Sequence, residues 1–156
     1  MILREQSIID RPPDAVWPYL VTPELFQKWN DKVESMDARE RFRKGQTFTT
    51  HYLWKGKPMQ CTTTVTELEE GRLIELRHAH MVGTSSPREM EAVERIELKP
   101  RGKGSVVTKT VDIMNSGVPW WLAPLIWFIN RFGTRQGEDK LKTLCETSQT
   151  AERRSP

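Results

Sequence analysis

Apolar and polar residues alternate with a period of two along most of the first 114 residues. This period is typical of β-strands whose side chains face a core on one side and solvent on the other. It predicts strands at residues 1–10, 33–42, 46–55, 59–69, 73–81, 88–99 and 105–114. Short turns rich in Gly, Lys and Pro separate most of these segments, so we expect an antiparallel sheet with one buried face.

Two short helices are expected between the first strand and the second. Pro12 and Pro13 end the first strand, because proline cannot donate to a strand ladder and suits a first helical turn. Apolar residues at helical spacing then predict helices at 13–20 and 23–30. Pro18 falls inside the first helix and should bend or shorten it.

The C-terminal part changes to a helical period from residue 119 to about 149. One helix of that length would extend about 45 Å and could cross the whole sheet. Its first part, residues 120–129, is apolar on every side, and such a helix needs burial or a partner. We expect one domain over residues 1–150 and a disordered tail at 151–156.

The first thirty residues carry a pattern that resembles a known superfamily. The pattern consists of Ile8, Pro12, Val16-Trp17, Thr22-Pro23-Glu24 and Trp29. It is similar to the opening of START / Bet v 1-like (SRPBCC) proteins, and most similar to the bacterial polyketide cyclase/dehydrase and lipid-transport group. The resemblance implies an α+β helix-grip fold: a curved antiparallel sheet of about seven strands wraps a long C-terminal helix and leaves a ligand cavity between them.

Composition narrows the classes of function. The net charge is only +3, and Lys and Arg alternate with Asp and Glu instead of forming a basic face, so nucleic-acid binding is not expected. The sequence begins without a basic-apolar leader, and no apolar run reaches the ~20 residues of a membrane span. A cytoplasmic protein is therefore expected. Cys61 and Cys145 lack metal-ligand spacing and are interpreted as small buried side chains.

Three polar residues interrupt the apolar sides of the predicted strands. His78 and His80 are two residues apart on one strand and should share a face. They could hydrogen-bond a ligand, act as acid or base, or simply be hydrogen-bonded near the rim. Glu94 needs a partner if buried, and Lys109 or Arg135 could supply it. No metal site and no organic cofactor are expected.

The function expected from these features is binding, or transport, of a small hydrophobic or amphipathic molecule such as a lipid or polyketide. The candidate ligand-binding residues are Phe48, Tyr52, Trp54, Leu76, His78, His80, Met90, Glu94, Phe128 and Arg135. A second hypothesis is a cyclase/dehydratase-type enzyme that uses a pocket His or Tyr as acid/base without metal or cofactor. A catalytic site would need titratable groups that converge on one point.

A third hypothesis concerns the apolar start of the last helix. Trp120, Trp121 and Trp127 could pack against the sheet, line the mouth of the cavity, or form a surface for transient membrane contact or a homodimer. Burial of these tryptophans inside one subunit would exclude the surface role.

Overall fold

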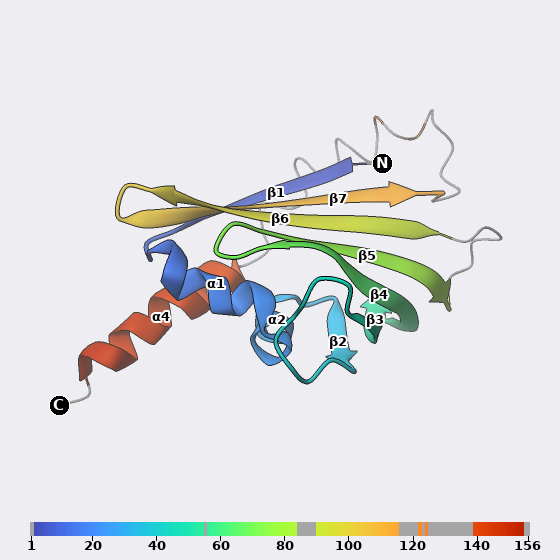
Figure 1. The fold of residues 1–156 in the computed structure, drawn as a ribbon, viewed down its shortest axis with the longest axis horizontal. Helices are drawn as coiled ribbons and strands as arrows, with labels where there is room; N and C mark the ends of the chain where they lie inside the picture. The colour runs from blue at the N-terminus through green and yellow to red at the C-terminus, as the bar shows by residue number, and fades with distance from the viewer. Residues whose placement is uncertain are drawn as a thin grey trace.

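The computed structural model describes residues 2–54, 56–83, 90–115 and 139–154, together with residues 122 and 124 (Figure 1). The side chains of Trp54 and of residues 149–154 lie outside this description. The elements are β1 (Ile2–Ile9), α1 (Pro13–Val21), α2 (Pro23–Trp29), β2 (Val33–Met36), β3 (Thr47–Trp54), β4 (Lys57–Glu69), β5 (Leu73–Val82), β6 (Glu91–Arg101), β7 (Gly104–Met114) and α4 (Lys140–Arg154).

The seven described strands form one antiparallel sheet in the order β1-β7-β6-β5-β4-β3-β2. Helices α1, α2 and α4 all lie on the same side of this sheet (Figure 1). We call that side the inner face. Its buried side chains include Ile74, Leu76, Ile96, Leu98 and Val107, which form one core with residues of α1 and α2. The expected sheet with one buried face is confirmed.

Helices α1 and α2 follow the predicted ranges within one residue. Val16 and Leu20 of α1 are fully buried. Pro18 lies inside α1 but does not shorten it, because the turn after Pro18 still closes with the amide of Thr22 donating to the Pro18 carbonyl (3.0 Å). The expected shortening is therefore wrong.

Strand β2 is much shorter than predicted and ends at Met36, whereas the alternation suggested a strand to residue 42. The chain beyond Met36 leaves the sheet, and its path is set by tertiary contacts. The Phe42 amide donates to the Val21 carbonyl (2.8 Å), and the Phe42 ring stacks on Phe48 with ring centroids 5.4 Å apart. Burial of Phe42 under the short helices thus overrides its strand pattern.

Helix α4 is the described part of the predicted C-terminal helix. It runs through Arg154, so the tail expected at residues 151–156 is helical over its first four residues, which are good helix formers. Polar contacts dock α4: the Lys142 ammonium donates to the Ile8 carbonyl (2.9 Å), and Tyr19 and Ser148 hydroxyls lie 2.7 Å apart. The segment 119–138 lies outside the described residues except for 122 and 124.

Burial divides the inner face into two halves. Near α1 its side chains are almost completely buried. Farther from α1 lies what we call the distal half, which comprises Met59, Val111 and Ile113 and is only half-buried. Between these two parts stands a group of polar side chains.

Candidate functional site

Six polar or ionisable side chains meet on the inner face where the closed core gives way to the distal half. This polar cluster consists of Tyr52 from β3, Cys61 and Thr63 from β4, His78 from β5, Glu94 from β6 and Lys109 from β7. Strand register brings them together. Thr63 lies opposite His78, and Glu94 lies opposite Leu76, which is two residues before His78 on β5. Tyr52 is four residues beyond Phe48, the residue opposite Thr63 on β3.

His78 is the centre of the polar cluster and is only 4% exposed. Its Nε2 lies 3.2 Å from Glu94 Oε2. Its Nδ1 lies 3.0 Å from Thr63 Oγ1, 3.2 Å from Tyr52 Oη and 3.8 Å from Cys61 Sγ. Both ring nitrogens are thus engaged, and the ring has a fixed orientation.

Glu94 connects His78 to a lysine on the neighbouring strand. The Lys109 ammonium lies 3.0 Å from Glu94 Oε1 and 5.4 Å from the centroid of the Trp29 ring. Glu94 Oε1 faces the Lys109 ammonium as an ion pair. Of the two partners considered from the sequence, Lys109 is the one that the structure shows.

Burial and charge shift the pKa values of the polar cluster in opposite directions. Burial alone would raise the pKa of Glu94, but Lys109 and His78 outweigh it and lower that pKa to about 2. Burial alone would lower the pKa of His78, but its hydrogen bonds and the negative charge of Glu94 raise that pKa to about 9. Burial, and secondarily the Glu94 charge, raises the pKa of Tyr52. At neutral pH Glu94 is a carboxylate, His78 an imidazolium and Tyr52 a neutral phenol.

Lys109 forms an ion pair with the Glu94 carboxylate, and the raised pKa of His78 favours its cationic form, so the polar cluster combines two cationic groups with one anionic group. Ionised groups buried in this way often contribute less to stability than apolar side chains of the same size. Strongly shifted titratable groups that lie together are characteristic of functional sites. The polar cluster is therefore the candidate site in the described part of the chain.

The structure brings together three of the polar residues expected from the sequence, Tyr52, His78 and Glu94. The candidate apolar residues Phe48 and Leu76 are buried beside them on the inner face. Met90 is half-buried immediately before β6. The Trp54 side chain, Phe128, Arg135 and the three tryptophans Trp120, Trp121 and Trp127 lie outside the described residues, so their roles stay predictions.

The expectation that His80 shares a face with His78 is wrong. The pairing of β4 with β5 shifts between Gln60/Val82 and Thr62/Ala79, which marks a β-bulge. His80 sits in this bulge with φ +52° and its side chain is exposed, whereas His78 is buried. The period of two, from which the shared face was expected, does not continue through a bulge.

Sequence reasoning missed the roles of Thr63 and Cys61. Thr63 is fully buried, where it lies 2.7 Å from the Thr50 hydroxyl as well as 3.0 Å from His78. The signal that could have found them is the spacing of two from Cys61 through Thr63 to Val65, which puts Thr63 on the same face of the predicted strand as an apolar residue. Cys61 and Cys145 are both buried free thiols, as expected.

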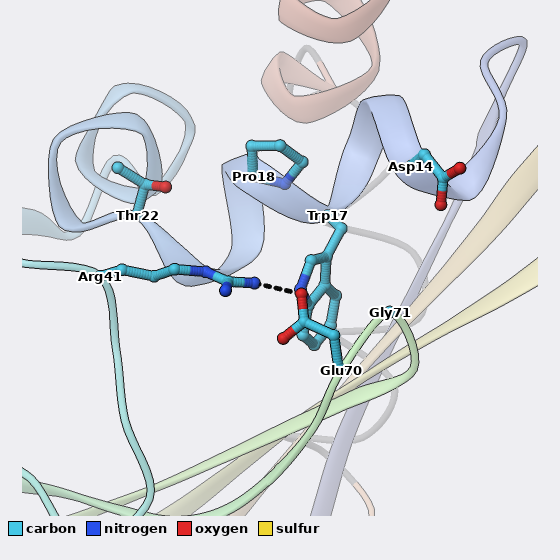
Figure 2. A pocket seen from close by; sticks show the side chains of 7 residues that line it. All are labelled: Asp14, Trp17, Pro18, Thr22, Arg41, Glu70 and Gly71. Atoms are coloured by element: carbon cyan, nitrogen blue, oxygen red, sulfur yellow. Dashed lines mark hydrogen bonds and ion pairs between the residues drawn. The ribbon is translucent and has the colours of Figure 1, made fainter.

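A separate groove of about 440 Å³ lies between α1 and the β4–β5 turn (Figure 2). Its lining residues are Asp14, Trp17, Pro18, Thr22, Arg41, Glu70 and Gly71. The Trp17 indole donates to Glu70 Oε1 (2.9 Å), and Arg41 pairs with the same oxygen. These groups satisfy one another, and none of the candidate ligand-binding residues lines this groove.

Comparison with known proteins identifies the family. The family model described as polyketide cyclase / dehydrase and lipid transport matches residues 1–146. The chain belongs to this family. No curated protein matches the sequence at a significant level.

Solved structures of the same fold confirm the helix-grip architecture. Protein NE0264 from Nitrosomonas europaea gives a TM-score of 0.64 at 20% identity and covers 99% of this chain and 97% of that chain. Ara h 8.0201 gives 0.64 at 14% identity, with coverage of 97% and 98%. DynU16, from the dynemicin biosynthetic locus, gives 0.62 at 15% identity and covers 94% of this chain but 48% of that chain. At these identities the likeness shows the fold alone.

None of the described helices is long and apolar enough to cross a membrane. Within the part of the chain that the structure describes, no group of three or more His, Cys, Asp or Glu side chains is placed to hold a metal ion.

Proposed function

We propose that the protein binds a small hydrophobic or amphipathic molecule, such as a lipid or a polyketide, between the inner face of the sheet and the C-terminal helix. The observation that supports this most strongly is the polar cluster itself. It places charged and hydroxyl groups at one point of an otherwise apolar surface. Ligand sites of soluble proteins have this composition, a mostly apolar wall with a few fixed polar groups.

The distal half of the inner face supplies the apolar wall in this proposal. Met59, Val111 and Ile113 are half-buried there, next to the polar cluster. Phe48 and Leu76 border it from the closed core. The family description, which includes lipid transport, supports a hydrophobic ligand. Trp54, Met90, Phe128 and Arg135 are further proposed contacts.

Displacement of a neutral fluorescent probe, N-phenylnaphthylamine, by dodecanoic acid tests this function. A matched pair of variants locates the site. Met59 faces inward and Gln60, the next residue, is exposed on the other face. Met59→Glu should weaken probe binding at least ~10-fold, because an apolar ligand would desolvate the new carboxylate. Gln60→Glu should leave binding unchanged. Failure of the folded protein to take up the probe, or equal effects of the two variants, would refute the proposed site.

The second candidate function is a cyclase or dehydratase that needs no metal or organic cofactor. The convergence of Tyr52, His78 and Glu94 favours it, because acid/base catalysis needs titratable groups at one point. Faster cyclisation of a linear poly-β-keto thioester than its spontaneous background would support it. That acceleration should disappear in Tyr52→Phe and persist in His80→Gln, which alters only the exposed histidine. A rate equal to background in the wild type would argue for binding alone.

A further inference from the structure

The hydrogen bonds of the polar cluster have a direction that follows from Lys109. The nearby ammonium keeps Glu94 ionised, and a carboxylate can only accept hydrogen bonds. His78 Nε2, 3.2 Å from Glu94, must therefore carry a proton and donate it. The Glu94 carboxylate, which lies 3.2 Å from Nε2 and is buried together with the ring, also favours a second proton on the ring, at Nδ1.

With Nδ1 protonated, the two hydroxyl groups beside it become acceptors. Thr63 Oγ1 and Tyr52 Oη lie 3.0 and 3.2 Å from Nδ1 and receive its hydrogen. Thr63 can then donate its own proton to Thr50, 2.7 Å away. For the proton of Tyr52 the described residues offer no oxygen or nitrogen acceptor, and the nearby sulfur of Cys61 is a weak one.

Tyr52 is also the member of the polar cluster that adjoins the distal half of the inner face. Its partner across the strands is Met59, and both side chains are half-buried. A ligand lying on that half would meet the Tyr52 hydroxyl first. The hydroxyl would act as a hydrogen-bond donor to the ligand, and the cationic groups His78 and Lys109 lie deeper in the polar cluster.

We propose that Tyr52 donates a hydrogen bond to an acceptor oxygen of the ligand, so that the site prefers amphipathic carboxylates to alcohols and disfavours amines of equal chain length. Lys109 is the specificity-determining residue in this proposal, since it sets the direction of the relay through Glu94 and His78. The proposal rests on the proposed binding function and names the polar end of its ligand.

Competition for N-phenylnaphthylamine among dodecanoate, dodecanol and dodecylamine at pH 7 tests this proposal. Dodecanoate should compete at least ~10-fold better than dodecylamine, since one hydrogen bond to a charged group corresponds to roughly 10- to 100-fold in affinity. Tyr52→Phe should reduce dodecanoate affinity by about the same factor and change dodecanol affinity less than ~3-fold. Lys109→Met should reduce the preference for dodecanoate, whereas Lys99→Met, on an exposed lysine of the outer face, should not.

The outcomes separate this proposal from the function on which it rests. If all three compounds compete equally, or if dodecylamine competes best, the head-group proposal is wrong while hydrophobic binding stands. If the protein takes up neither the probe nor any of the compounds, the binding function itself fails. If Lys109→Met does not fold, the wild type and Tyr52→Phe still decide the question.

Discussion

The two faces of the central sheet carry the same kinds of charged residue in very different surroundings. On the outer face, Arg95 pairs with Glu75 at 3.2 Å and with Glu97 at 3.1 Å, and its side chain is 42% exposed. On the inner face, Glu94, the neighbour of Arg95 in sequence, pairs with Lys109 and His78 and is only 7% exposed. Exposed ion pairs of this kind contribute little to the stability of the fold.

The charged side chains of the inner face are in a different physical situation. Their charges have lost most of their hydration, and each is held by the others. Removing one member leaves the rest buried without compensation, whereas the outer pairs return to water when they are broken. The comparison indicates that the inner charges are suited to recognition or chemistry, and it can be tested by perturbing each face in turn.

The largest effect is expected for Glu94→Ala. The substitution leaves Lys109 and His78 as neighbouring buried cations, so we expect a loss of about 3–5 kcal/mol in the free energy of unfolding. Urea denaturation measures it. A loss below about 1 kcal/mol would mean that the inner group is hydrated like the outer one.

The next effect is a dependence of stability on pH. The folded-state pKa of His78 is raised from 6.5 to about 9, so its contribution is complete below pH 6.5 and is lost as pH rises through 9. The folded-state pKa of Glu94 is lowered from 4.5 to about 2, so its contribution is present above pH 4.5 and is lost as pH falls through 2.

Unfolding free energies measured from pH 6 to 10 should therefore decline in the wild type by up to about 3 kcal/mol. His78→Gln should remove most of this decline, whereas His80→Gln should retain it. A wild-type profile that is flat across this range would contradict a buried imidazolium.

A smaller effect is expected for Thr63→Val. The substitution removes the hydroxyl 3.0 Å from His78 Nδ1, at a cost of about 1–2 kcal/mol. Thr64→Val is the matched control, because Thr64 makes its 3.2 Å contact with Thr47 on the exposed side of the same strand. Thermal denaturation should separate the two variants, and equal melting temperatures would count against the buried hydrogen bond.

The smallest effect is expected for Arg95→Ala on the outer face. Loss of its two exposed ion pairs should change the free energy of unfolding by no more than about 1 kcal/mol. Added salt should reduce that difference further. A change as large as that of Glu94→Ala would erase the contrast between the two faces.

Alternation in the sequence was sufficient to predict the sheet and to place Tyr52, His78 and Glu94 on apolar sides of their strands. It could not predict that they meet, because convergence depends on the register between strands that are far apart along the chain. It also placed His80 wrongly, since a bulge with positive φ at a histidine leaves little trace in the pattern. Strand β2 was overextended because Phe42 continues the alternation while packing under α1 and α2.

The most direct test of the ligand site uses the three histidines of this chain, His51, His78 and His80, as reporters. Side-chain ¹⁵N resonances followed by NMR during a titration with dodecanoate would report contact at each one. We predict that the His78 resonances shift to saturation while those of the two more exposed histidines, His51 and His80, stay in place. Saturable binding of dodecanoate that leaves His78 unchanged would contradict the placement of the ligand at the polar cluster.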